Sequence, residues 1–293
     1  MVNDASSEFI REFEKKAESI TNDIDRSKKY RAGIATLAQK AVETNNTTFL
    51  DAAVRFTGKI IDEHDRSKAF VDIVSGTARV AINTADAELA GRSLELSANT
   101  EAGHDHSHAL QGVVAAMAEI GAKMDDPVTI EDSKELAGTI EYDTYRSSAW
   151  RSIARTQHSN DDTPSAVESA NKAMAIIDKS KLIGQDIYRA SAYVDLARFF
   201  IDVGQEDMAR KCITKAVDSS AGLEDEFERS SIFQTIAETQ VRMGVRIKNS
   251  ELLEDAVESF GHITREYYRT STRQTLASVL SNLKEDELVK RMA

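Results

Sequence analysis

The segment Tyr188–Val217 contains two runs of apolar residues at helical spacing, separated by Gly204. Each run places its apolar side chains on one face of a helix: Tyr193, Leu196, Ala197 and Phe200 in the first, and Ala209, Ile213 and Ala216 in the second. Two amphipathic helices joined by a turn account for this pattern. The segment therefore predicts an antiparallel helical hairpin with one buried stripe on each helix.

Short polar motifs that contain a basic residue recur along the whole chain. They are separated by forty residues five times and by forty-three residues once, at Arg26, Arg66, His106, Arg146, Arg189, Arg229 and Arg269. We call these seven residues the anchors. An insertion at Lys181–Gly184 explains the longer interval. A fixed period of this length is the sequence signature of a protein built from repeated supersecondary units.

The positions four, seven and eight residues after each anchor define one helical face. The fourth is bulky and apolar in six repeats and basic in the last: Tyr30, Phe70, Leu110, Trp150, Tyr193, Phe233 and Arg273. The seventh is Gly33, Ile73, Val113, Ile153, Leu196, Ile236 and Leu276. The eighth is usually small: Ile34, Val74, Val114, Ala154, Ala197, Ala237 and Ala277. Seven related first helices are predicted.

Glycine and proline mark the turns between the helices of each pair. Gly121, Gly204 and Gly244 share one position, fifteen residues after the anchor, where a residue free to adopt positive φ can end a helix. Asp126-Pro127 and Thr163-Pro164 are each predicted to be a capping residue followed by proline in the first turn. The predicted second helices are Thr48–Ile61, Ala85–Ser97, Pro127–Ile140, Pro164–Ile177, Glu206–Ser219 and Ser250–Thr264.

The alternation of large and small residues around a turn resembles the tetratricopeptide repeat. It is clearest over 146–217, where Trp150, Ile153, Ala154, Ala166, Ala170 and Ala173 match the pattern of the following hairpin. The unit is about six residues longer than the usual repeat of that family. The resemblance implies an all-α, right-handed α-solenoid of about seven antiparallel hairpins. We expect a single domain over 1–293, with a cap helix at 5–21, repeats at 22–283 and a closing cap at 284–293.

Composition restricts the classes of partner. A net charge of -12 and a pI near 5.1 argue against a nucleic-acid or anionic-membrane binder, because neutralising phosphates needs dense Lys and Arg. The single cysteine, Cys212, lies on a predicted buried stripe, which excludes an intrachain disulfide and fits a reducing compartment. The amino-terminal stretch is charged and lacks the apolar run of a secretory signal. These features predict a cytoplasmic protein.

One tract offers metal ligands, since His104, His106 and His108 alternate with Asp105 and Ser107. Imidazoles at alternate positions can converge on zinc or nickel if the backbone is extended. The tract also aligns with Glu63–Lys68, which favours a polar helix start with Asp105 near the cap. We therefore expect no metal and no cofactor, and retain a metal-binding regulatory module as an alternative.

The first helices of tetratricopeptide-like proteins line a concave groove. Solvent-facing positions of the equivalent helices here carry eight bases and three acids, although acids outnumber bases over the whole chain. The candidate partner-binding residues are Arg31, Arg79, Arg151, Arg155, Arg198 and Arg242. A row of guanidinium groups can bind carboxylates bidentately. Pairing of these arginines with acids of neighbouring helices is the competing interpretation, and the anchors are expected to form such structural pairs.

Catalytic signatures are absent from the sequence. It contains no phosphate-binding glycine loop, no HExxH motif and no GxSxG serine elbow, so the chain is not predicted to be an enzyme. We expect a scaffold or adaptor that binds another protein or peptide, acidic in character, along the groove. A helical toroid with a central pair of catalytic carboxylates is a further alternative, which a single tryptophan disfavours because such sites stack sugars on aromatic rings.

Overall fold

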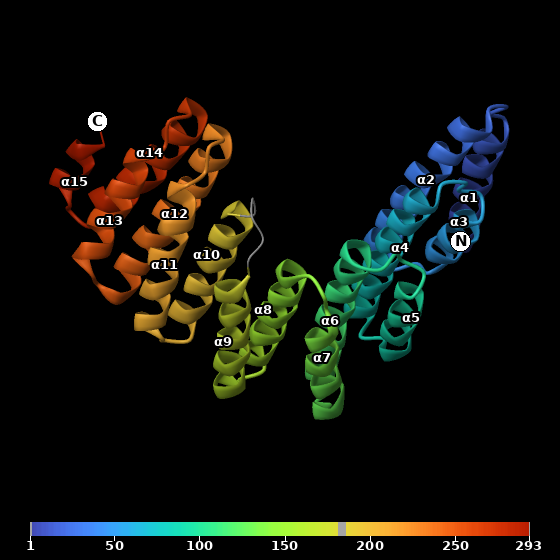
Figure 1. Cartoon of the computed structure of the whole chain (residues 1–293), viewed down its shortest axis with the longest axis horizontal. Coiled ribbons are helices and arrows are strands. Elements are labelled where there is room, and N and C mark those ends of the chain that lie inside the picture. The colour runs from blue at the N-terminus through green and yellow to red at the C-terminus, as the bar shows by residue number, and fades with distance from the viewer. Residues whose placement is uncertain (1, 181–185, 293) are drawn as a thin grey trace. The chain divides into compact units, whose positions relative to one another are not determined.

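The computed structural model of the chain describes residues 2–180 and 186–292 (Figure 1). The described residues form fifteen helices and no strand, so the all-α fold class is confirmed. The first eight helices are α1 (Val2–Glu18), α2 (Asp23–Thr44), α3 (Thr48–Thr57), α4 (Glu63–Thr84), α5 (Ala87–Ser97), α6 (His104–Lys123), α7 (Pro127–Thr139) and α8 (Asp143–Ser159). The others are α9 (Thr163–Lys179), α10 (Asp186–Asp202), α11 (Glu206–Ala221), α12 (Glu226–Ile247), α13 (Ser250–Gly261), α14 (Glu266–Asn282) and α15 (Asp286–Arg291). The insertion expected at Lys181–Gly184 lies outside the described residues.

The chain divides into two compact units, 1–169 and 170–293. Within each unit, first helices pack on first helices: α2 on α4, α4 on α6 and α6 on α8 in one unit, and α10 on α12 and α12 on α14 in the other. Six second helices, namely α3, α5, α7, α11, α13 and α15, pack against their own first helices, as Figure 1 shows for α12 and α13. The predicted helical-repeat fold, similar to that of tetratricopeptide repeats, is therefore confirmed. The single domain over 1–293 stays a prediction.

The predicted buried stripe is confirmed in every repeat that has an apolar residue at the fourth position after its anchor. Those six side chains have exposed fractions between 0% and 8%. In the last repeat the corresponding Arg273 lies over the ring of Phe260, with 5.8 Å from the guanidinium carbon to the ring centroid. Cys212 is buried as predicted, and it contacts Met174 with 3.7 Å between the sulfur atoms.

All seven hairpins turn in the same way. One residue adopts the left-handed conformation, and the N–H of the next residue donates to the carbonyl five residues before it, over 2.7–3.2 Å. This is the Schellman arrangement that ends many helices. The left-handed residues are Asn45, Ala85, Asp125, Asp161, Gly204, Lys248 and Lys284.

These turns fall at two distances from the anchors, fifteen or nineteen residues. Repeats with the later turn have first helices of 20–22 residues and second helices of 10–13 residues. Repeats with the earlier turn have first helices of 17 residues, and in α9 and α11 the second helix reaches 17 and 16 residues. One helical turn is thus transferred between the two helices while the forty-residue period is kept.

The expected helix-ending role of glycine is confirmed at one position and wrong at two. Gly204 has φ of +75° and forms its turn, whereas Gly121 and Gly244 lie inside helices α6 and α12. A Cβ at Gly244 would lie 2.7 Å from Leu253 Cδ2 and 3.0 Å from the Asn249 carbonyl. These two glycines allow the second helix to approach closely.

The residues that cap the helices agree only in part with those predicted from the sequence. Asp126 caps α7 as expected, accepting from the Val128 N–H over 3.0 Å, with Pro127 in the first turn. Thr163 was predicted to cap α9 but is its first residue. Asp162 fills the capping role instead, because its carboxylate accepts from the Ser165 N–H over 3.2 Å. Gly103 is the capping position of α6, and Asp105 lies in the first turn, near the cap as predicted.

The amino-terminal helix covers the first repeat of its unit. The Phe13 ring of α1 occupies the space where a side chain of Gly33 would project, 1.9 Å from the position of a Cβ there. Phe13 also contacts Tyr30 and Phe56, with ring centroids 5.9 and 5.6 Å away. Among the described residues, no helix combines the length and the apolar character that crossing a membrane requires.

Candidate functional site

Six anchors are arginines with one shared structural contact. Each guanidinium donates to a backbone carbonyl one to three residues after the end of the preceding helix, over 2.9–3.1 Å as the shortest distance: Ile20, Ile60, Ile140, Ser180, Leu223 and Ile263. A cation at this end of a helix also interacts favourably with the helix dipole. His106 replaces the arginine in the third repeat, with Nδ1 3.1 Å from the Ser97 carbonyl oxygen. The anchors therefore join consecutive helices.

The serine that follows several anchors forms hydrogen bonds with the backbone at the start of the next repeat. Ser27 accepts from the Ile61 N–H over 3.1 Å, and Ser67 accepts from the Glu101 N–H over 2.8 Å. Ser230 accepts from the N–H groups of Thr264 and Arg265, each over 3.2 Å. These serines are buried, where an unpaired N–H would be costly. The recurring motif is thus explained by backbone contacts inside the stack.

The six candidate groove arginines all lie on first helices, as predicted, but they are divided between the two units. Arg31 on α2, Arg79 on α4, and Arg151 and Arg155 on α8 belong to the first unit; Arg198 on α10 and Arg242 on α12 belong to the second. Whether they form one groove stays a prediction.

Two of these arginines contact the neighbouring first helix. Arg31 forms an ion pair with Asp72 of α4, with 2.6 Å between Nη1 and Oδ2. Arg198 donates from Nε to the Thr239 hydroxyl of α12 over 3.0 Å. The contact of Arg31 matches the competing interpretation, pairing with an acid of a neighbouring helix, whereas Arg198 contacts a hydroxyl group. Arg79 and Arg242 differ, because both are exposed and neither has a hydrogen bond or ion pair with another described residue.

A shallow depression of about 140 Å³ lies beside Arg79, between α2 and α4. Its apolar lining comes from Ala35, Ala38 and Val42, and its polar lining includes Gln39, Asp72, Ser75 and Arg79. The close approach of the two helices at Gly76 forms its floor, since a Cβ there would lie 3.1 Å from the Ala38 Cβ. The depression lies next to a guanidinium group that has no hydrogen-bond or ion-pair partner among the described residues.

The histidine tract is helical from its first residue, which separates its imidazoles. His106 contacts the end of α5, whereas His104 has Nε2 2.8 Å from the Tyr145 hydroxyl, and His108 stacks on the Tyr145 ring at 4.9 Å. Within the described part of the chain, the one set of His, Cys, Asp and Glu ligand atoms that are all within 4.8 Å is His64, Glu101 and Asp105. The three histidines of the tract are therefore not brought to one point.

Each unit also contains a tyrosine–carboxylate–lysine cluster that the sequence patterns did not reveal. In the second unit, Tyr193 donates to Asp178 over 2.5 Å and Lys215 pairs with the same carboxylate. Burial raises the pKa of Asp178, but the bonds from Lys215 and Tyr193 outweigh it, so the pKa is lowered overall. In the first unit, Tyr30 donates to Glu18 over 2.8 Å and Lys59 lies 3.1 Å from it.

Cys212 has no environment that would activate a nucleophile. Burial raises the pKa of its thiol to about 12, an effect that Lys215 reduces without reversing. The thiol is therefore protonated at neutral pH, and its role is packing between α11 and the part of α9 in the same unit.

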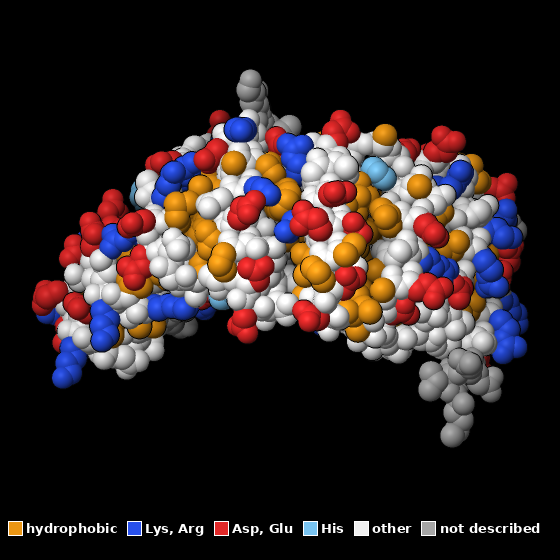
Figure 2. Space-filling model, turned by 90° about the horizontal axis from the view of Figure 1, so that it is seen from below, with side chains coloured by type: hydrophobic (Ala, Val, Ile, Leu, Met, Phe, Trp, Pro, Cys, Tyr) orange, Lys and Arg blue, Asp and Glu red, His pale blue; other side chains and the backbone are white. Residues whose placement is uncertain are grey.

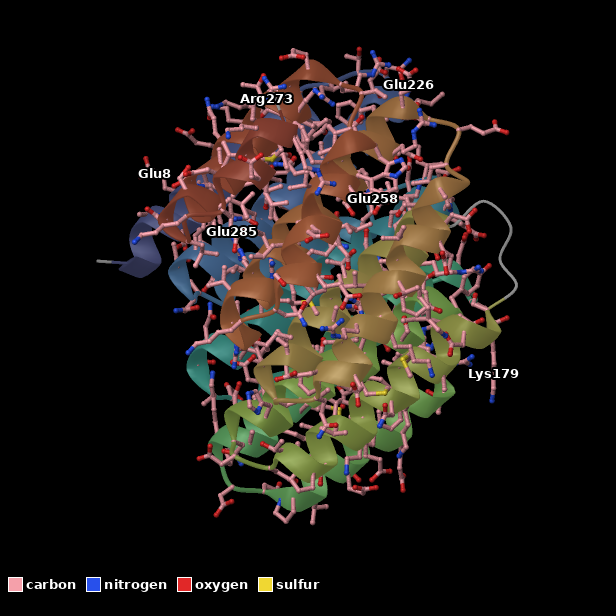
Figure 3. All side chains as sticks on the ribbon, turned by 90° about the vertical axis from the view of Figure 1, so that its left-hand side faces the viewer. Glu8, Lys179, Glu226, Glu258, Arg273 and Glu285 are labelled. Atoms are coloured by element: carbon pink, nitrogen blue, oxygen red, sulfur yellow. The ribbon has the colours of Figure 1, made fainter. Side chains whose placement is uncertain are left out.

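Charged side chains cover much of the surface. Figure 2 shows acidic and basic groups interspersed with apolar side chains on the face it draws. Exposed residues such as Glu8, Lys179 and Glu226, labelled in Figure 3, lie on the outer faces of their helices. Such interspersed charge is typical of a solvated surface.

No protein-family profile matches the chain, and no curated protein matches it. Among solved structures, a Rap protein complexed with competence and sporulation factor is 13% identical, with 97% of this chain and 81% of that chain covered and a TM-score of 0.44. Ton1535 from Thermococcus onnurineus NA1 is 13% identical, with 89% and 93% covered and a TM-score of 0.26. A circular tandem repeat protein is 14% identical, with 98% and 74% covered and a TM-score of 0.33.

Proposed function

We propose that this chain is a non-catalytic scaffold that binds an acidic segment of another protein through arginines on its first helices. The observation that carries the proposal is the state of Arg79 and Arg242, which are exposed and have no described hydrogen-bonding or ion-pairing partner. A guanidinium group in this state can accept a carboxylate without first breaking an internal contact.

The surroundings of Arg79 support the same proposal because a basic group and a depression lie side by side there. Arg79 borders the depression between α2 and α4, whose apolar lining can receive a side chain while the guanidinium binds an adjacent carboxylate. Arg31 in the first unit and Arg198 in the second each join two neighbouring first helices. Such contacts order the first helices of each unit before a partner binds, which reduces the entropic cost of binding.

A charge-reversal experiment with a matched control tests the proposal. Arg79→Glu with Arg242→Glu changes one available arginine in each unit. Arg55→Glu with Lys211→Glu changes the net charge equally on exposed positions of the second helices α3 and α11. Binding of a fluorescein-labelled peptide of alternating aspartate and glutamate is measured by fluorescence anisotropy. We expect the first pair to weaken binding about tenfold and the second pair to change it less than about twofold.

Quantitative mass spectrometry of proteins retained from a native extract extends the test to natural partners. Proteins that are retained by the wild type and by the second-helix pair, but not by the first-helix pair, are expected to contain acidic segments. Absence of peptide binding by the wild type, or equal weakening by both pairs, contradicts the proposal.

A further inference from the structure

His64, Glu101 and Asp105 form a compact group at the junction of the second and third repeats. His64 lies in the first turn of α4, Glu101 in the loop after α5, and Asp105 in the first turn of α6, all within the first unit. One potential ligand atom from each residue lies within 4.8 Å of the others, and His64 Nδ1 is 3.3 Å from Glu101 Oε2. The stacking of repeats brings together residues that are distant in sequence.

A second layer of hydrogen bonds holds two of these ligands in place. Ser67 accepts from the Glu101 N–H over 2.8 Å and donates its hydroxyl to Asp105 Oδ2 over 2.7 Å. The other oxygen of Asp105 is 3.3 Å from His104 Nδ1, and the Tyr145 hydroxyl is 2.8 Å from His104 Nε2. Ordered contacts of this kind around ligand side chains are typical of metal sites.

Several other repeats have an apolar or aromatic side chain at the position of His64. The position of His64 is occupied by Ile24 in the first repeat and by Phe227 in the sixth. Phe227 contacts Tyr268 of the next repeat, with ring centroids 5.2 Å apart. Tyr268 occupies the position, directly before the anchor, that Asp105 occupies in the third repeat. A ring contact therefore joins two repeats at one junction, and polar ligand groups replace it at the other.

The ligand chemistry matches a divalent transition metal. Zinc is bound by imidazole nitrogen and carboxylate oxygen at about 2.0–2.2 Å, which places neighbouring ligand atoms of a tetrahedral site about 3.3 Å apart. The distance from His64 Nδ1 to Glu101 Oε2 has this value. The Asp105 side chain is only 12% exposed, so its carboxylate is partly removed from competing water.

We propose that His64, Glu101 and Asp105 bind a divalent transition-metal ion of the zinc type, with water completing its coordination. His104 and Ser67 position the Asp105 carboxylate. The ion links the second and third repeats, at the place where the contact of Phe227 with Tyr268 links the sixth and seventh. This proposal is independent of the arginines on the first helices.

The test is a calorimetric titration of the full chain with zinc chloride, after chelator treatment and removal of the chelator. The variants are His64→Ala and Glu101→Gln, whose side chains are 58% and 50% exposed, so that folding is not at risk. The controls are His262→Ala in the second unit and His108→Ala within the histidine tract. Circular dichroism checks that every variant is helical.

We expect one equivalent of zinc to bind the wild type, and each of the two ligand variants to bind at least about tenfold more weakly. His262→Ala and His108→Ala are expected to bind as the wild type does. The proposal is overturned if the wild type binds no zinc, if the ligand variants retain wild-type affinity, or if affinity is lost with His108 instead.

Discussion

At the scale of single residues, three glycines at one position of the repeat serve two purposes. Gly204 supplies a left-handed backbone conformation at a turn, whereas Gly121 and Gly244 lie within helices that a second helix approaches closely. A left-handed conformation favours glycine, and so does a contact too close for a Cβ atom. Glycine therefore occurs at this position of the repeat for two different physical reasons.

Gly244→Ala should lower the free energy of unfolding of the second unit by about 1–3 kcal/mol, because the added methyl overpacks a tight contact. The Asn249 carbonyl is backbone, so α12 and α13 must separate to relieve it. Gly261→Ala is the control: no atom within 4 Å would meet its Cβ, and we expect a gain of about 0.4–1 kcal/mol. Urea denaturation followed by circular dichroism measures both, and equal effects would contradict the close-packing explanation.

At the scale of helices, each anchor arginine joins the end of one helix to the start of the next. Its guanidinium satisfies a carbonyl in the connection just after the preceding helix, which no helical N–H can reach. Arg229 on α12 shows the contact clearly, donating to the Leu223 carbonyl over 2.9 Å. The acids before the anchors have their own roles: Asp225 caps α12, while Asp143 and Asp186 pair with Arg146 and Arg189.

Arg229→Met should therefore destabilise the second unit by about 1.5–3 kcal/mol, since it removes a charge-assisted hydrogen bond and retains an aliphatic side chain. Arg242→Met, on the same helix but exposed and without a described partner, should change stability by less than about 0.5 kcal/mol. Thermal and urea unfolding compare the two. If both variants were equally stable, the anchors would not have the structural role assigned to them.

At the scale of the whole molecule, the chain consists of two compact units of stacked hairpins. In such an arrangement each repeat contacts its neighbours, so stability is approximately a sum of repeat and interface contributions. A deletion at one end of the chain should therefore destabilise the neighbouring repeats and leave distant repeats unchanged. This behaviour differs from that of a globular domain with one cooperative core.

Deleting α14 and α15, to leave residues 1–263, tests this expectation. Leu276 and Leu280 of α14 are buried against the preceding repeat, so their removal exposes an apolar face of α12 and α13. Hydrogen exchange measured by mass spectrometry should show reduced protection in α12 and α13 and unchanged protection in α2 and α4. A uniform loss of protection along the chain would show that the two units unfold as one.

The sequence by itself determined the all-α class, the seven hairpins and the buried stripes, because amphipathic periodicity is a local property of each helix. Cys212 was correctly placed in the core for the same reason. The arginines were correctly placed on first helices, and pairing with an acid of a neighbouring helix, the competing interpretation, holds for Arg31 with Asp72.

Only the tertiary structure decided which residues meet across repeats. Several cross-repeat contacts join residues forty-one positions apart, as in Arg31 with Asp72, Arg198 with Thr239 and Arg210 with Glu251. A search for complementary side chains at that separation could have found them. The turn positions, and the meeting of His64 with Glu101 and Asp105, depend on how neighbouring helices pack. Stacking register is set by contacts between repeats, which the periodicity of one helix does not encode.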